Sequence, residues 1–307
     1  MSRGRGHGIR IAVLDSGVEW SHPDLANVRR ADDLVIVEEG GRLEAVPAPA
    51  GGEDVFGHGT AVTGILHEIA PEAEIGSFRV LDLRNQSQSE MICFGAQLAI
   101  ERGYHILNCS FGARLKAQVL MFKSWVDRAY LSGHHVVAAC NNEDFRRAEW
   151  PGDFTSVITV NMLATPEREC LFRNQPGTLV EFAALGVNVN VPWKGRIRRD
   201  ATGSSFAAPR AAALLARMLS IFLTCLPSRR RDCFTRSPAA CPHANVFNFQ
   251  LPCHRQFPVD IHSTTVRRAK FLLSPAYFCH SHLHRHARCC HHRHLPFDPR
   301  SGRAPAG

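Results

Sequence analysis

The sequence lacks the long apolar run that would open a secretory leader or cross a membrane. Arg3 and Arg5 near the start are followed by no extended apolar stretch. The most apolar segment, residues 211–226, is interrupted by Arg217 and is typical of a buried core helix. No segment repeats with the period of a solenoid. We therefore expect a cytoplasmic protein without a membrane partner.

Glycine and acidic residues are scarce in the last part of the chain, and this scarcity divides the sequence in two. Residues 221–307 hold two of the 23 glycines and three of the 28 Asp and Glu residues, but 13 of the 36 Lys and Arg residues. They also hold seven of the 11 cysteines and ten of the 17 histidines. We predict one folded domain over residues 1–223 and a basic tail over residues 224–307.

Three short motifs occur in an informative order: DSG at residues 15–17, GHGT at 57–60 and GSSFAAP at 203–209. Acyl transfer needs a nucleophilic hydroxyl, an imidazole that takes its proton and a carboxylate that orients the imidazole. Each motif alone is also typical of an ordinary turn or loop. Together, in the order acid, base, nucleophile, they predict Asp15, His58 and Ser205 as a catalytic triad.

With these motifs the chain resembles the subtilase family of serine peptidases (peptidase S8) over roughly residues 8–220. The resemblance implies a subtilisin-like, doubly wound and mostly parallel α/β sheet. It also implies a serine endopeptidase that acts on peptide or protein substrates through an acyl-enzyme, without a cofactor. The alternative is a catalytically silent, subtilase-like protein that binds peptides or partner proteins. Nothing in the sequence indicates the oligomeric state.

Hydrophobic patterning agrees with alternating strands and helices. Buried strands are predicted at residues 9–14, 73–81, 105–111 and 135–140, and shorter strands at 157–161, 179–183 and 187–191. Helices are predicted at residues 58–69, 89–102, 115–131 and 204–223. Such alternation is typical of a doubly wound parallel sheet. Asp15 then ends a strand, while His58 and Ser205 begin helices.

Two further strand ends are interpreted through the resemblance. The strand at residues 136–140 runs into a polar turn, where Asn142 would be the oxyanion-hole donor beside the Ser205 backbone N–H. Taken without the triad, the Asn-Asn pair would simply be a turn. The strand at residues 106–112 would pair with an extended substrate. The residues expected to line the first subsites are Ser110, Phe111, Gly112, Ala139, Cys140 and Asn141.

The resemblance also places Glu149 at the far end of the primary pocket and Glu143 at its rim. Two carboxylates around one concave site would favour a substrate with Lys or Arg before the scissile bond. The alternative is that both are solvated loop charges neutralised by Arg146 and Arg147, since exposed pairs contribute only about 0–1 kcal/mol.

A structural calcium ion, which many subtilases hold, would lie by resemblance near Asp24 in the HPDL segment at residues 22–25. The loop that completes such a site after the histidine helix has no counterpart, because residues 68–74 run directly from helix to strand. Calcium needs roughly six to eight oxygen ligands. We therefore expect no metal at this position.

The cysteines support a reducing location. Four of them lie in apolar or strand settings typical of buried free thiols, namely Cys93, Cys109, Cys140 and Cys170.

The tail allows three interpretations. Its Cys and His residues could bind a metal, yet they match no paired Cys-x-x-Cys or His-x-x-x-His array. The arginines at 229–231 and 267–268 suggest a nucleic-acid or acidic partner, but no recognition fold is evident, so we expect no nucleic-acid partner. Disorder agrees best with the Pro, Arg and His content. Because the composition changes abruptly near Thr224, we expect a truncated peptidase domain or a shifted reading frame.

Overall fold

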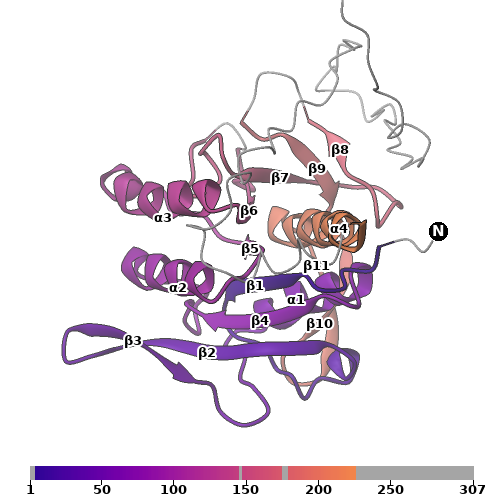
Figure 1. The fold of residues 1–307 in the computed structure, drawn as a ribbon. Helices are drawn as coiled ribbons and strands as arrows, with labels where there is room; N and C mark the ends of the chain where they lie inside the picture. Colours follow the sequence, from indigo (N-terminus) through magenta and orange to yellow (C-terminus); the bar gives the residue numbers. More distant parts are fainter. Residues whose placement is uncertain (1–3, 145–146, 175–178, 226–307) are drawn as a thin grey trace, which may run out of the picture. The chain divides into compact units, whose positions relative to one another are not determined.

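The computed structural model describes residues 4–144, 147–174 and 179–225, which are drawn as coloured ribbon in Figure 1. The tail and its three interpretations lie outside the described residues. Among those that are described, nine strands form one sheet in the order β3-β2-β4-β1-β5-β6-β7-β9-β8. The seven inner strands are parallel, and β3 and β8 pair antiparallel at the two edges.

The parallel strands account for most of the predicted ones. Their bounds are β1 Arg10–Asp15, β2 Arg29–Glu39, β4 Glu74–Arg79, β5 Ile106–Cys109, β6 His135–Ala139, β7 Ile158–Leu163 and β9 Phe182–Leu185. Strand β9 begins three residues later than the predicted strand at 179–183. A separate two-stranded sheet pairs β10 (Val189–Trp193) with β11 (Ile197–Ala201). Two short 3₁₀ turns, η1 (Pro23–Leu25) and η2 (Lys116–Gln118), complete the connections.

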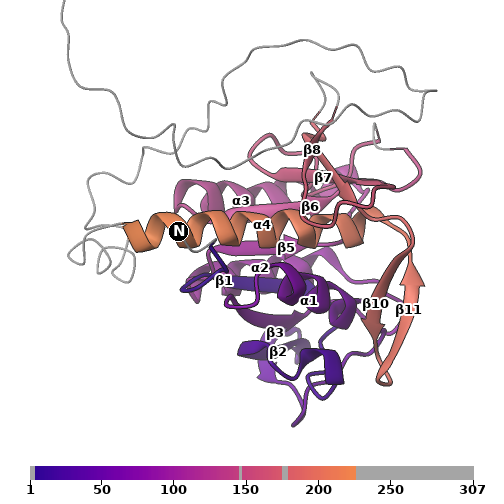
Figure 2. The ribbon, with the colours of Figure 1, turned by 90° about the vertical axis from the view of Figure 1, so that its right-hand side faces the viewer.

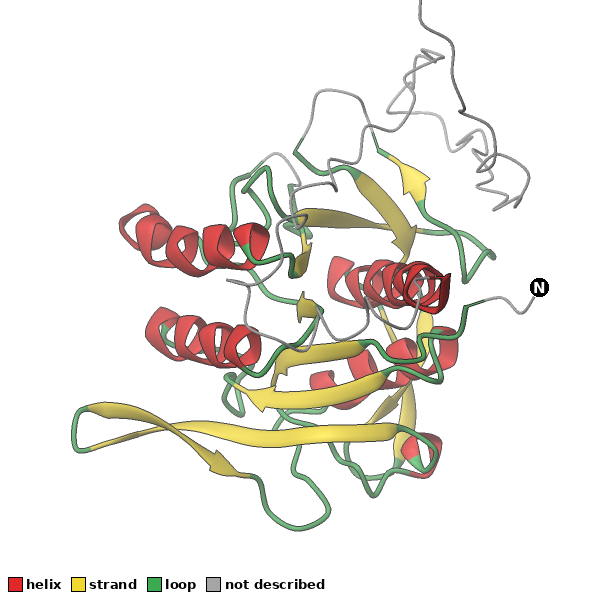
Figure 3. Cartoon of the chain, in the orientation of Figure 1, coloured by secondary structure: helices red, strands yellow, loops and turns green. Residues whose placement is uncertain are grey.

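Helices cover both faces of the sheet (Figures 1 and 3). One face carries α2 (Ser89–Glu101) and α3 (Val119–Leu131), and the other carries α1 (His58–Ile69) and α4 (Ser204–Cys225), as the turned view in Figure 2 also shows. Side chains of β1 alternate between the two layers: Ile11 and Val13 join the core under α1 and α4, whereas Ala12 and Leu14 join the core under α2 and α3. The predicted doubly wound fold is confirmed.

Four strands were not predicted. Strand β2 turns back through Gly40 and Gly41 into β3 (Arg42–Pro47), and the short strand β8 (Phe172–Arg173) and strand β11 were also missed. Both turn glycines have positive φ, 58° and 76°, which the two-residue hairpin turn requires. The Gly-Gly pair is a sequence signal for such a turn. The charged residues at both ends of β2, however, make its short buried run difficult to identify as a strand.

Helix α4 is the longest helix of the described chain. By length and composition its window Ser204–Phe222 could cross a membrane, and 56% of that window is buried inside the fold. A core helix passes the same test. Arg217 in this helix donates to the Gly4 carbonyl at 2.9 Å, so the helix also anchors the N-terminal segment.

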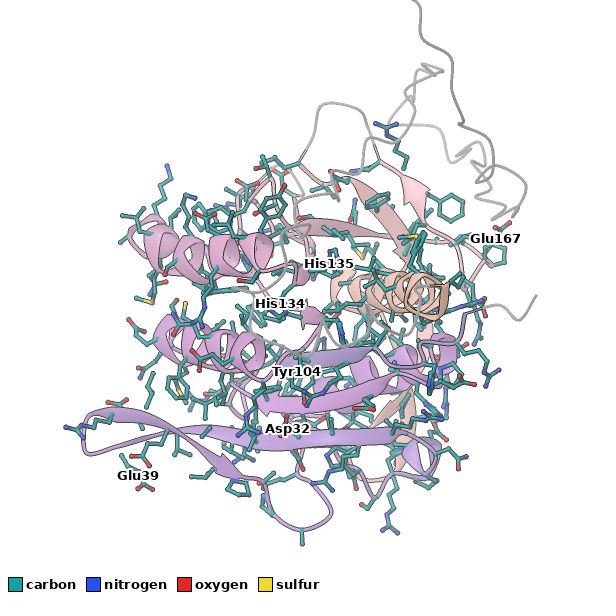
Figure 4. The ribbon with its side chains drawn as sticks, viewed as in Figure 1. Asp32, Glu39, Tyr104, His134, His135 and Glu167 are labelled. Atoms are coloured by element: carbon teal, nitrogen blue, oxygen red, sulfur yellow. The ribbon has the colours of Figure 1, made fainter. Side chains whose placement is uncertain are left out.

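Three histidines gather at the amino ends of β5 and β6. His105 Nδ1 accepts a hydrogen bond from the Arg10 backbone N–H at 3.0 Å, and the His134 ring contacts the Tyr104 carbonyl at 2.7 Å (Figure 4). Burial lowers the pKa of His105 to about 4, helped by the charges of His134, Arg10 and His135. Burial likewise lowers the pKa of His135, so this end of the sheet opposes the protonation of His105 and His135.

Acid should destabilise the fold through His105. Its pKa lies near 6.5 when unfolded and near 4 when folded, so the unfolded state binds more protons between these values. Stability should fall as the pH drops from about 6.5 to about 4, by roughly 2–3 kcal/mol, because one pKa unit is worth about 1.4 kcal/mol. Urea unfolding of His105→Asn across this range should show a shallower loss. The exposed His7→Asn is the control, and an unchanged slope in His105→Asn would contradict this assignment.

Candidate active site

Asp15 and His58 form a buried pair at the carboxyl end of β1. Asp15 is the last residue of that strand and is 1% exposed, and His58 is the first residue of α1 and is 5% exposed. His58 Nδ1 lies 2.9 Å from each Asp15 carboxylate oxygen. The contact fixes the imidazole with its Nδ1–H donating to Asp15, which leaves Nε2 as the ring nitrogen available to a substrate or a nucleophile.

A second buried carboxylate, Asp54, connects the Asp15 turn to the start of α1. Its Oδ1 accepts from the Ser16 hydroxyl at 2.7 Å and from the Gly57 N–H at 2.5 Å. Its Oδ2 accepts from the Thr60 N–H at 2.8 Å and from the Thr60 hydroxyl at 2.6 Å. Asp54 therefore satisfies the Gly57 and Thr60 N–H groups at the start of α1, while the Gly59 N–H donates to the Ser16 hydroxyl at 3.1 Å. Asp54 was not predicted as a site residue, although an Asp just ahead of a helix start is a known capping signal.

The electrostatic environment favours the charged form of His58. Burial lowers its pKa, but the Asp15 charge, the hydrogen bond to Asp15 and the charge of Asp54 together raise the pKa above its ordinary value. An imidazole in this place accepts a proton more readily than one that is buried without acidic neighbours.

Ser205 lies in the first turn of α4, directly before a residue that contacts His58. The neighbouring Phe206 ring lies 5.2 Å from the His58 ring, centroid to centroid. Both residues are described, and no hydrogen bond joins Ser205 to His58; such contacts are often long in unliganded enzymes and shorten with substrate. Pro209 lies within α4, where it leaves the Ser205 carbonyl without its i+4 donor. The Ser110 hydroxyl donates to that carbonyl at 3.1 Å instead.

Asn142 lies beside Ser205 with its amide orientation fixed. Its Oδ1 accepts from the Ser204 N–H at 2.7 Å, so its Nδ2 is free to donate elsewhere. A Cβ placed on Gly203 would lie 3.2 Å from Ser205 Oγ and 3.6 Å from Asn142 Nδ2. The hydroxyl and the amide therefore border the same small space, which only a glycine at 203 leaves open.

The residues expected to line the subsites are brought together in part. Ser110 contacts Ser205, and Asn141 Nδ2 donates to Glu149 Oε1 at 2.7 Å. Ala139 and Cys140 are buried beneath the turn, and Phe111 packs partly into the core under α2 and α3. Gly112 lies so close to Glu149 that a Cβ there would overlap the carboxylate.

Among the described residues, the arginine that pairs with Glu149 is not one of those expected from the sequence. Arg114, rather than Arg147, pairs with Glu149, through an Nε–Oε1 contact of 2.6 Å. Arg147 and Glu143 are exposed, and Arg146 lies outside the described residues.

Trp193 lies beside His58 and was likewise not predicted as a site residue. It comes from β10, outside the main sheet, and its ring lies edge-on to His58 at 6.5 Å. Gly57 has φ of 117° and leaves no room for a Cβ against the Trp193 ring. The β10–β11 turn is held to the fold by Lys194 Nζ, which donates to the Val55 carbonyl at 2.7 Å.

Comparison with known proteins identifies the family. The family model described as "Subtilase family" (Peptidase_S8) matches residues 6–237. This chain belongs to the subtilase family. The family resemblance predicted from the three motifs is confirmed.

Individual relatives of this subtilase are distant. Minor extracellular protease Epr of Bacillus subtilis (strain 168) is 32% identical over 222 residues, which cover 69% of this chain and 32% of that protein. Subtilisin E of the same strain is 29% identical over 241 residues, covering 74% and 59%. The same strain's Major intracellular serine protease is 31% identical over 227 residues, covering 69% and 68%. The chain thus spans about a third to three fifths of the first two relatives' length.

A solved structure supports the fold. The chain of an "S41 Psychrophilic Protease" matches this subtilase with a TM-score of 0.60 and 24% identity, over 71% of this chain and 79% of that chain.

The residues near Asp24 do not fit a calcium ion. Asp24 forms an ion pair with Arg198 of β11, so a guanidinium already balances this carboxylate. Helix α1 ends at Ile69 and β4 begins at Glu74, which leaves only residues 70–73 between them. A cage of roughly six to eight oxygens has no place in so short a connection.

Calcium should therefore leave the thermal stability unchanged. We expect the same melting temperature with millimolar calcium and with a chelator, in the original protein and in Asp24→Ala. Loss of the half-exposed pair with Arg198 should cost about 0–1 kcal/mol in either solution. A rise in melting temperature with calcium that Asp24→Ala abolishes would contradict this expectation.

Proposed function

We propose that this subtilase is a serine endopeptidase that hydrolyses peptide bonds through Asp15, His58 and Ser205. The observation that supports it most is the buried Asp15–His58 pair, placed beside a helix N-terminus that carries Ser205 and borders the Asn142 amide. Relatives named as proteases agree with this chemistry. No feature of the described residues favours the catalytically silent alternative.

In the proposed first step, Ser205 Oγ attacks the substrate carbonyl and its proton passes to His58 Nε2. Asp15 accepts from Nδ1–H throughout and stabilises the imidazolium without taking a proton itself. The imidazolium then donates its proton to the departing amine, and the acyl group stays on Ser205. Water, deprotonated by His58, hydrolyses this ester in the second step and restores the enzyme.

The negative charge that develops on the carbonyl oxygen needs fixed donors. Asn142 Nδ2 and the Ser205 N–H, which has no acceptor among the described residues, are the two groups proposed for this task. Losing one such donor typically costs about 10²–10³ in turnover. Because Ser204 holds the Asn142 amide in place, the donor needs little reorganisation when charge develops.

The substrate is proposed to be an extended peptide or protein segment. It would lie along the segment after β5, against Ser110 and Gly112, with the turn at Asn141 on its other side. Main-chain hydrogen bonds of this kind give affinity, and the side-chain sites between them give selectivity.

A fluorophosphonate should modify Ser205 and no other serine. Ser205→Ala should abolish labelling and His58→Ala should reduce it strongly, because the hydroxyl then lacks its base. Ser204→Ala is the matched control: its hydroxyl donates to the Cys140 carbonyl at 2.6 Å, so labelling should persist. Intact mass and peptide mapping measure the result. Folded protein that takes up no label would favour the silent interaction protein.

The pH dependence of kcat/KM should change when the charge of Asp54 is removed. His58 must be neutral to act as base, so kcat/KM should rise as the pH increases through its raised pKa. Asp54→Asn removes one of the charges that raise this pKa, so the acid limb should move to lower pH. The plateau should also fall, because α1 loses acceptors at its start. Asp127→Asn on α3 removes a remote surface carboxylate as a control, and identical acid limbs in all three proteins would refute this role.

A further inference from the structure

Glu149 places a carboxylate against Asn141 and Gly112, in the segments that follow β6 and β5. Its side chain is 9% exposed, and its Oε1 accepts from Asn141 Nδ2. Asn141 directly precedes the proposed oxyanion donor. On the other side, Trp150 exchanges two backbone hydrogen bonds with Ala113, at 2.8 and 2.9 Å, three residues after the Ser110 that contacts Ser205. Glu149 therefore lies between the two segments that flank Ser205.

The hydrogen-bonding capacity of this carboxylate is only partly used. Both of its donors, Asn141 Nδ2 and Arg114 Nε, contact Oε1. Oε2 faces Gly112 and has no donor among the described residues. A carboxylate can take two parallel hydrogen bonds from a guanidinium, one on each oxygen. The buried carboxylate thus keeps an acceptor for a further cation.

Arg114 is held loosely compared with its partner. Its side chain is 56% exposed, and its contact with Glu149 uses Nε alone. Water can solvate such an exposed guanidinium when it leaves its partner. The guanidinium can therefore leave Glu149 for water, whereas Glu149, being buried, needs a cation in its place.

We propose that Arg114 is a built-in competitor that occupies Glu149 in the resting enzyme, and that a Lys or Arg side chain before the scissile bond replaces it. The inference rests on the proposed peptidase function. The residue whose carbonyl reaches Ser205 and Asn142 is the substrate residue closest to Asn141, so its side chain is the one that can reach Glu149. When a substrate Lys or Arg binds Glu149, the ion pair between Glu149 and Arg114 is lost and one between Glu149 and the substrate forms. The net gain in binding free energy is therefore smaller than it would be without Arg114.

Peptide pairs that differ only in Arg or citrulline before the scissile bond test this directly, because citrulline keeps the shape and removes the charge. We expect the original protein to cleave the Arg peptide with about tenfold higher kcat/KM, since hydrogen bonds between charged groups are stronger than those between neutral groups and the competitor offsets part of the gain. Arg114→Gln should raise this ratio several-fold through a lower KM. Glu149→Gln should bring it to about one.

Arg128→Gln is the matched control, because Arg128 is a similarly exposed arginine that pairs with Glu101 on the helical face. It should leave the ratio unchanged. A ratio near one in the original protein, or a ratio that Arg114→Gln does not raise, would overturn the inference while cleavage of the citrulline peptide still supported the peptidase function.

Binding to Ser205→Ala provides a second measurement that does not need turnover. Fluorescence anisotropy should show tighter binding of the Arg peptide than of the citrulline peptide, and a wider difference when Arg114→Gln is added. Equal binding of both peptides by folded protein would overturn the inference. Absence of fluorophosphonate labelling in the original protein would instead mark the failure of the peptidase proposal itself.

Discussion

The buried hydrogen bond between Asp15 and His58 is the constraint on which the site depends. A carboxylate that is 1% exposed is costly unless donors surround it, and Asp15 accepts from the His58 ring and from the Ser16 N–H at 2.7 Å. The Ser16 hydroxyl donates its single proton to Asp54 at 2.7 Å, and Asp54 in turn holds the start of α1. The position of His58 therefore follows from a connected set of buried polar contacts.

The doubly wound sheet brings these contacts to one edge. Asp15 ends β1, Ser110 follows β5 and Asn142 follows β6. The polar residues at the carboxyl ends of these three neighbouring parallel strands therefore lie at the same edge of the sheet. Two helices on one face add their N-termini, which carry His58 and Ser205. Free N–H groups at a helix start suit both a capping carboxylate and a developing oxyanion.

Much of this arrangement could be predicted from the sequence, because strand ends and helix starts carry local signals. The positions of Asp15, His58 and Ser205 followed from short motifs in their local context, and their roles remain a proposal. Trp193 and Arg114 could not be predicted in the same way, because each contacts a partner far away in the sequence and neither belongs to a local motif. Arg114 is an ordinary surface arginine by composition, and only the fold places it against Glu149. The Gly-Gly pair of the β2–β3 hairpin is a local turn signal, but the charged residues at the ends of β2 made the strand before it hard to predict.

If these groups form a working acyl-transfer site, Ser205 should be acylated before the product is released, and pre-steady-state hydrolysis of a p-nitrophenyl ester measures this. We expect a burst of p-nitrophenol close to one equivalent of folded protein, with the acyl group found on Ser205 after an acid quench. The burst should disappear in Ser205→Ala and fall by about 10⁴ in rate in Asp15→Asn, where the imidazole loses its orienting acceptor. Linear release with no acylated Ser205, from protein that is shown to be folded, would refute the proposed acyl-transfer site.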